Sequence, residues 1–262
     1  MNPFPVDAYA YANRLHAAHP GEKLLFAGLT MGVALAAGSP IVAAAGFALA
    51  CLAATRMAGI PLVVFLRFVR LPLGFVLAGA LSMAVSVVDP SAALASLPVG
   101  RWQVGVAPAG LSQAVRVFGV SAACIAAGTF LALTTPVADI GAQLRRWRVP
   151  GLFVELLLLV YRFVFVLVET AQSIHLAQEA RLGYVTRRRT LHSVGLLVSS
   201  LLVRALARAD ALFTALSARG YTGRLDVLDE EFAWSRRNLG LVAAAAVAQL
   251  AFAIATRLGG LP

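Results

Sequence analysis

The sequence predicts an all-α membrane protein with about five transmembrane helices, or six if one further apolar segment also crosses the bilayer. Hydrophobic residues make up 60% of the 262 residues and charged residues only 13%, whereas soluble domains carry about 25% charged residues. Such a chain has too few polar groups to cover a water-exposed surface, so a bilayer must serve as much of its solvent. The apolar residues also gather in runs of about 20, the length that a helix needs to cross the hydrocarbon core.

Breaks in the apolar runs place the expected spans. The first run covers residues 24–55, too long for one span, and Gly38-Ser39-Pro40 divides it, because Ser39 can cap a helix that begins at Pro40. Residues 89–108, which include Trp102, are expected to form a loop at the headgroup layer. The expected spans are residues 21–38, 40–56, 71–88, 112–135 and 239–258.

The distribution of basic residues predicts the orientation. With a cytoplasmic N-terminus, 19 of the 22 basic residues fall on the inner side, and the exceptions are Arg101, Arg116 and Arg257. The positive-inside rule therefore favours a cytoplasmic N-terminus and an outer C-terminus. Because the arginines lie in short segments between apolar runs and form no basic patch on a polar domain, nucleic-acid binding is not expected.

Residues 151–168 are apolar and about long enough to cross. However, they contain Glu155 and Arg162, which are costly in lipid. Crossing would also place the arginines beyond residue 170 on the opposite side from the basic run at residues 145–148. A helix that lies against the membrane or dips into it is therefore favoured, and a sixth span is the alternative.

The chain is thus expected to have three parts. Residues 1–139 form a membrane part with four spans, residues 140–238 a cytoplasmic or interfacial helical region, and residues 239–262 the last span and the C-terminus. The acidic residues 226–231 are expected to form a solvated or interfacial connector.

Within the middle part, residues 170–182 continue as helix, and Thr190 is expected to cap an amphipathic helix that ends at Gly220. Arg187 and Arg188 then fall in the connecting loop. Apolar residues recur every three or four positions along this helix, which predicts one apolar face. They are Leu191, Val194, Val198, Leu201, Ala205, Ala209, Leu212 and Leu216. Another face is expected to hold the basic residues Arg204, Arg208 and Arg219.

The two helices have similar C-terminal sequences. The first ends in Gln178-Glu179-Ala180-Arg181-Leu182-Gly183-Tyr184 and the second in Leu216-Ser217-Ala218-Arg219-Gly220-Tyr221. An arginine at a helix C-terminus interacts favourably with the helix dipole, alanine permits close approach, and glycine turns the chain away. Either ending alone would be read as an ordinary cap, but two in succession favour arginines presented for docking on a partner.

These residues resemble the transmembrane T component of energy-coupling factor (ECF) transporters, specifically the cobalt-type CbiQ proteins. The resemblance covers about residues 16–238 and is carried by His19-Pro20-Gly21-Glu22-Lys23, Arg145-Arg146-Trp147-Arg148-Val149-Pro150, the run 154–163 and both Ala-Arg endings. It implies two long, crossed cytoplasmic coupling helices that dock on two ABC-type ATPase subunits. The implied docking residues are Ala180, Arg181 and Leu182, with Ala218, Arg219 and Gly220. Leu182 stands where the second ending has glycine, so the two tips need not share one geometry.

The resemblance further implies a non-catalytic subunit of the bacterial inner membrane that serves cobalt uptake. ATP and Mg would be bound by the partner ATPases. The substrate would be captured by a separate S component, with or without a small accessory membrane subunit. Nickel and vitamin transporters of this kind use arginines at the helix ends in the same way, so they remain alternatives.

The sequence lacks the residues that other classes of membrane protein would need. The chain has no Gly-x-x-x-x-Gly-Lys-Ser/Thr loop, so any ATP must be bound elsewhere. A membrane enzyme acting on lipid substrates would need convergent acidic or histidine residues, and a self-sufficient permease would be expected to show internal repeats. His175 and Glu179 are four residues apart but have no third ligand nearby, and His16 and His19 are expected in a polar N-terminal turn. No metal site and no bound cofactor are expected in this chain.

Overall fold

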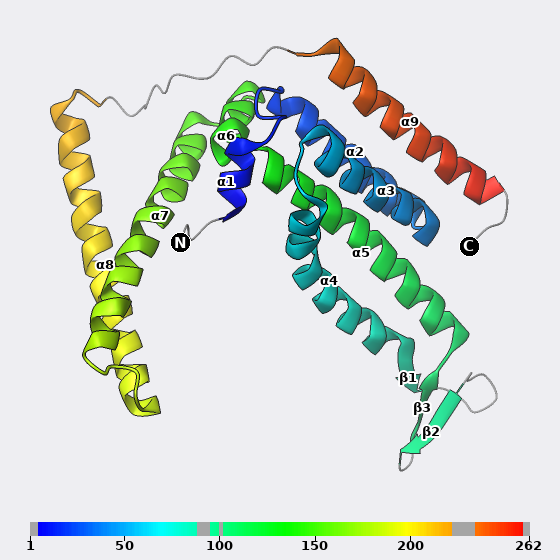
Figure 1. Cartoon of the computed structure of the whole chain (residues 1–262), viewed down its shortest axis with the longest axis horizontal. Helices are drawn as coiled ribbons and strands as arrows, with labels where there is room; N and C mark the ends of the chain where they lie inside the picture. Colours follow the sequence, from blue (N-terminus) through cyan, green and yellow to red (C-terminus); the bar gives the residue numbers. More distant parts are fainter. Residues whose placement is uncertain (1–4, 88–94, 100–101, 222–233, 259–262) are drawn as a thin grey trace. The chain divides into compact units, whose positions relative to one another are not determined.

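The structure is a computed structural model that describes residues 5–87, 95–99, 102–221 and 234–258. These residues fall into two compact units, one drawn from residues 137–230 and the other from residues 4–136 and 231–262. The larger unit contains α1 (Pro5–Ala12), α2 (Pro20–Ala37), α3 (Pro40–Leu52), α4 (Leu62–Ala84), α5 (Pro108–Thr134) and α9 (Arg236–Leu258) (Figure 1). The smaller unit contains α6 (Val137–Arg146), α7 (Gly151–Ala180) and α8 (Arg187–Ala218).

The all-α polytopic class is confirmed. Among the described residues, six helices are long and apolar enough to cross a membrane, by length and composition. They are Pro40–Met57, Leu62–Ala84, Pro108–Thr134, Gly151–Ala180, Arg187–Ala218 and Arg236–Thr256. The first of these joins α3 to a π-helical turn, Ala53–Met57. α2, which occupies the first expected span, is not among the six.

The α2–α3 turn lies where the Gly-Ser-Pro sequence predicts it. Gly38 has a φ of +61°, in the left-handed region that glycine adopts without strain, and its N–H donates to Ala34 O at 3.2 Å. Pro40 is the first residue of α3. Ser39 is the N-cap residue of α3, as expected, but its side chain makes no capping hydrogen bond.

Two segments differ from the expected pattern. α4 begins at Leu62 instead of residue 71, because Phe65 and Val69 are fully buried and hold the first two turns against the other helices. Part of the expected 89–108 loop forms two strands, β2 (Ala95–Val99) and β3 (Trp102–Val106). They join β1 (Val85–Val87), which replaces the end of the expected span 71–88, in one sheet. The strands are antiparallel in the order β1-β3-β2, and Val106 pairs with both Val85 and Ala95. Nothing is described of Arg101 or of the side chain of Trp102.

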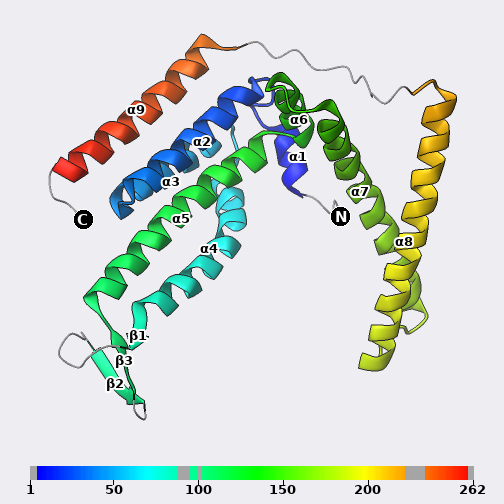
Figure 2. The same ribbon diagram turned by 180° about the vertical axis from the view of Figure 1, so that it is seen from behind.

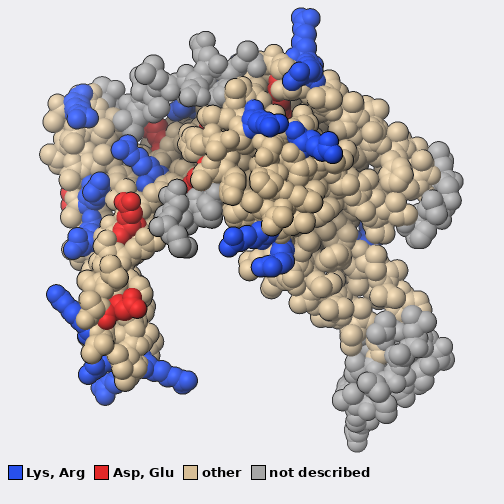
Figure 3. All heavy atoms as spheres, in the orientation of Figure 1, with Lys and Arg blue, Asp and Glu red and all other residues tan. Residues whose placement is uncertain are grey.

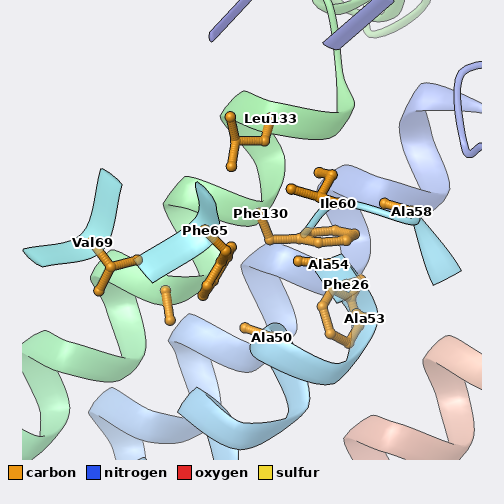
Figure 4. Close-up of a cluster of buried hydrophobic side chains, with 11 residues drawn as sticks. Phe26, Ala50, Ala53, Ala54, Ala58, Ile60, Phe65, Val69, Phe130 and Leu133 are labelled. Atoms are coloured by element: carbon orange, nitrogen blue, oxygen red, sulfur yellow. The ribbon is translucent and has the colours of Figure 1, made fainter. Parts of the chain in front are cut away.

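Small side chains let the helices of the larger unit approach closely. Ala34 of α2, Ala43 of α3 and Ala123 of α5 are all fully buried and form one cluster. A second cluster packs Phe26 and Phe130, whose ring centroids are 5.0 Å apart, beside Phe65 and several alanines (Figure 4). Alanine at such contacts is typical of membrane helix bundles, where close van der Waals packing replaces the hydrophobic driving force.

A buried polar cluster, here called the α2 clasp, ties the start of α2 to two other parts of the larger unit. The carboxylate of Glu22 accepts hydrogen bonds from the Ser235 N–H at 2.7 Å and from Asn238 Nδ2 at 3.0 Å. Lys23 Nζ donates to Thr134 O, at the end of α5, at 2.9 Å. His19 stacks on Trp234, with ring centroids 4.0 Å apart, and caps α2 by accepting the Gly21 N–H. His19, Glu22 and Lys23 are each no more than 3% exposed.

Candidate functional site

The α7–α8 pair carries the residues that the sequence singled out. The two helices contact each other and run antiparallel, since a short turn joins them (Figures 1 and 2). Arg181 follows the end of α7 at this turn, and Arg219 follows the end of α8 at the opposite end of the pair. With a rise of 1.5 Å per residue, helices of this length separate the two arginines by about 45 Å.

The two helix ends have the same backbone hydrogen-bond pattern. At the first tip, residues 178–184, the Leu182 N–H donates to Glu179 O at 2.9 Å and the Gly183 N–H to Gln178 O at 2.9 Å. At the second tip, residues 216–221, the Gly220 N–H donates to Ser217 O at 3.1 Å and the Tyr221 N–H to Leu216 O at 3.0 Å. Both are Schellman caps, which satisfy the last carbonyls of a helix.

The residue after each arginine adopts the left-handed conformation. Gly220 has a φ of +76° and Leu182 a φ of +59°. The substitution of leucine for glycine therefore does not give the first tip a different geometry, although a side chain in this region is strained. Arg181 and Arg219 also have nearly the same backbone angles, with φ −95° and ψ 15° for the first and φ −96° and ψ 12° for the second.

Three side chains hold the first tip: Gln178 and Tyr184 of the ending itself, and Ser193 of α8, which no sequence pattern indicated. Gln178 Nε2 donates to Ser193 O at 3.0 Å, the Ser193 hydroxyl donates to Gly183 O at 2.9 Å, and the Tyr184 hydroxyl donates to Gln178 Oε1 at 2.6 Å. Ser193 is 7% exposed. A Cβ at Gly183 would lie only 2.7 Å from Ser193 Oγ and 2.9 Å from Gln178 O. Glycine is therefore required there by close packing, while its neighbour Leu182 has the unusual φ.

The expected cap of α8 is wrong by one turn. Thr186 is the N-cap, and its hydroxyl accepts the Arg189 N–H at 3.3 Å. Thr190 lies inside the helix, where its hydroxyl donates to Thr186 O at 3.0 Å. Arg187 and Arg188 consequently belong to the first turn of α8 and not to a loop. The basic residues of this first turn oppose the helix dipole, so the helix begins here despite an unfavourable local charge.

The second tip is linked back to the start of α7. The Tyr221 hydroxyl donates to Glu155 Oε2 at 3.4 Å, and Glu155 is 8% exposed. Burial, together with the negative charge of Glu155, raises the pKa of Tyr221. Tyr221 therefore keeps its proton at neutral pH and can hold the carboxylate as a donor.

The guanidinium groups of Arg181 and Arg219 are exposed, and neither has a side-chain partner among the described residues. Basic side chains gather on the α7–α8 pair, most densely at the end where α7 turns into α8 (Figure 3). The Schellman bonds use the backbone N–H groups of the two arginines and of the two residues after each of them, so the exposed arginine side chains are the charged groups left to bind a partner.

Among the residues that the structure describes, no group of three or more His, Cys, Asp or Glu could hold a metal ion. The ring centroids of His175 and Tyr184 are 4.5 Å apart, so His175 packs against the first tip. The acidic residues 226–231, expected to form a connector, lie outside the described part of the chain.

The fold and the site define a polytopic helical membrane protein with two matched arginine-bearing helix ends. The family model for CbiQ, described as a cobalt transport protein, matches residues 12–228. The chain belongs to the CbiQ family of cobalt transport proteins and is a membrane component of a cobalt transporter.

Relatives agree with this membership. The cobalt transport protein CbiQ of Rhodobacter capsulatus is 40% identical over 185 residues, 71% of each chain. The CbiQ of Salmonella typhimurium is 31% identical over 60% of this chain and 70% of its own. A putative fused cobalt transport protein, CbiMQ, of Methanocorpusculum labreanum is 32% identical over 51% of this chain and 22% of its own length.

Proposed function

We propose that the chain is the coupling subunit of an ATP-driven ECF-type importer for cobalt. It passes the motion of two ABC-type ATPase subunits to a separate substrate-binding membrane subunit. The observation that carries this proposal is the matched pair of tips, in which Arg181 and Arg219 follow the two ends of one helix pair with the same cap and nearly the same backbone angles.

Each tip offers a guanidinium to a groove on one ATPase. An arginine presents five N–H donors in a rigid fork, so it can bind carboxylates or carbonyls at fixed angles, which the point charge of lysine cannot reproduce. Because the caps use the backbone N–H groups of both arginines and of the two residues after each, the exposed guanidinium groups would define the contact. When ATP closes the ATPase dimer, the two tips, about 45 Å apart, move with their own ATPase, and the α7–α8 pair passes that displacement to the bilayer.

Cobalt as the cargo is supported by the family and by the relatives from Rhodobacter capsulatus and Salmonella typhimurium, which are cobalt transport proteins. Nickel and vitamins are the alternatives. The fused relative joins CbiQ to CbiM in one chain, which supports a membrane partner as the substrate-binding subunit. ATP and Mg would be bound by the ATPases.

The proposed orientation places the N-terminus and the α7–α8 pair on the cytoplasmic side of the bacterial inner membrane. ATP is cytoplasmic, so the tips must be reachable from that side. The excess of arginine in and around these helices agrees with this placement.

The test is co-purification with the ATPases in detergent. Arg181→Ala with Arg219→Ala should release the ATPases, because truncating one member of a hydrogen-bonded charge pair typically costs about 2–5 kcal/mol. Both residues are exposed and lie outside the helices, so the chain should stay folded. Arg187→Ala with Arg188→Ala, in the first turn of α8, is the matched control. A tip variant that retained ATPase and cobalt uptake at the wild-type level would contradict the coupling role.

A further inference from the structure

A groove of about 1010 Å³ lies between α7 and α8. Its walls are mainly apolar and include Leu159, Phe163 and Leu167 of α7 and Leu212 of α8. The groove occupies the half of the pair away from the α7–α8 turn, where the Gln178–Ser193 hydrogen bond holds the two helices together. Every residue that lines it belongs to the smaller unit.

Three arginines share this groove with the apolar walls. Arg162 comes from α7, and Arg204 and Arg208 come from successive turns of α8. The expected separation of the arginine face from Leu212 and Leu216 is wrong here, because residues 204, 208, 212 and 216 are four apart and form one row of α8 that lines the groove.

The charge of the groove is not balanced within the described residues. No Asp or Glu lines the groove, and none of the three guanidinium groups has a hydrogen-bond or ion-pair partner there. The nearby carboxylate of Glu155 is held by Tyr221. Three exposed cations without counter-charges beside apolar walls fit an occupant that is both anionic and apolar.

We propose that this groove binds an anionic phospholipid of the leaflet on which the α7–α8 pair lies. The phosphate would accept charge-assisted hydrogen bonds from Arg162, Arg204 and Arg208, while an acyl chain would follow the apolar walls. Basic side chains beside an anionic membrane surface are a general means of lipid recognition. This inference uses the interfacial placement from the proposed function, but it does not depend on ATPase docking.

A helix of a membrane partner is the other candidate occupant. To balance the three arginines, that helix would have to bring carboxylates into an apolar trough, and desolvating such ion pairs can cost more than their attraction returns. A phospholipid keeps its phosphate at the polar boundary and needs no such burial. The observations therefore favour lipid.

The test is lipid retention by the full-length chain, measured by native mass spectrometry after extraction from membranes that contain phosphatidylglycerol and phosphatidylethanolamine. The wild-type chain should retain phosphatidylglycerol preferentially. Arg162→Gln with Arg204→Gln and Arg208→Gln should lower that preference on the order of a hundredfold, since each basic residue near an anionic surface contributes a factor of about five. Arg187→Gln with Arg188→Gln and Arg189→Gln removes the same charge outside the groove and should change it far less.

A second variant tests the groove without changing charge. Ala209 lines the groove and is exposed, so Ala209→Trp should block the acyl chain and also reduce retention. If the triple variant is poorly folded, Ala209→Trp and the single substitution Arg208→Gln test lipid binding in the groove instead. Arg208→Gln is expected to lower phosphatidylglycerol retention about fivefold.

Equal loss in the groove and control triples would mean general charge attraction and would overturn the proposal. Unchanged lipid retention, with loss of a co-purified membrane subunit, would assign the groove to a protein partner and overturn it as well. ATPase co-purification should be unaffected by the groove variants, because Arg181 and Arg219 are intact. A failure of the coupling proposal is thus distinguishable from a failure of this one.

Discussion

Glu22 accepts a hydrogen bond from the backbone N–H of Ser235 at 2.7 Å, although 213 positions separate the two residues. The contact joins the first turn of α2 to the residue that precedes α9, and Asn238 adds a second bond to the same carboxylate. The α2 clasp therefore fixes the start of α9 to the first turn of α2 within the larger unit.

Removing the Glu22 carboxylate should destabilise the start of α9. Glu22→Ala leaves the Ser235 N–H and the Asn238 amide without their buried acceptor, which costs about 1–3 kcal/mol for each unsatisfied group. Glu22→Gln keeps one acceptor oxygen and should cost less. The melting temperature in detergent would show this order, and equal melting temperatures for Glu22→Ala and wild type would refute a stabilising clasp.

Leu182→Gly should stabilise the first tip. Leu182 has a φ of +59° and is 62% exposed, so glycine would relieve backbone strain of about 1 kcal/mol and lose little packing. The reciprocal change, Gly220→Ala at a φ of +76°, should destabilise the second tip by a similar amount. Protection of the amides at each tip against hydrogen exchange would measure both effects, and a loss of protection in Leu182→Gly would contradict this account.

Gly183→Ala should disrupt the first tip. Its Cβ would lie 2.9 Å from the backbone oxygen of Gln178, which cannot move without opening the cap. The expected cost is about 1–3 kcal/mol, together with weaker ATPase co-purification.

Gly195→Ala is the matched control for this change. A Cβ at Gly195 has no atom within 4 Å, and the residue lies inside α8, so alanine should stabilise the helix by about 0.5–1 kcal/mol. If both substitutions had the same effect on melting and on ATPase binding, the tight packing of Gly183 would not matter.

The sequence predicted what depends on local patterns. Apolar runs located the helices, Gly38 and Gly220 marked two of their ends, and the two Ala-Arg endings were recognised before their geometry was known. The sheet also had a local signal, because the alternating residues Trp102-Gln103-Val104-Gly105-Val106 have the period of a strand.

Other features depend on contacts that no local pattern encodes. The left-handed conformation of Leu182 opposes the preference of leucine and follows from the cap around it. The Glu22–Ser235 bond joins residues too far apart for any periodicity to reveal. The groove needs α7 as its second wall, and no periodicity of α8 shows that Leu159, Phe163 and Leu167 of α7 lie opposite.

The last prediction concerns whether α7 and α8 cross the bilayer, since both are long and apolar enough to do so. Crossing as a pair would place the α7–α8 turn, with Arg181, outside the cell. It would also carry Arg187, Arg188 and Arg189 across the membrane.

Such a crossing would further leave Arg162, Arg204 and Arg208 within helices in the bilayer. The cost is about 2.5–3.5 kcal/mol for each arginine near the bilayer centre. We therefore expect the turn to stay on the cytoplasmic side, where it can reach an ATPase.

Labelling of one engineered cysteine in intact cells separates the two arrangements. Val185 is 63% exposed in the turn, so Val185→Cys is accessible to a reagent on its own side of the membrane. In a chain whose native Cys51 and Cys124 are replaced by alanine, Val185→Cys should not react with a membrane-impermeant maleimide until the cells are opened. Ala109→Cys, exposed at the start of α5 and expected on the outer side, should react in intact cells. Reaction of Val185→Cys from outside would make α7 and α8 true spans, put Arg181 and Arg219 on opposite sides of the membrane, and exclude their joint docking on cytoplasmic ATPases.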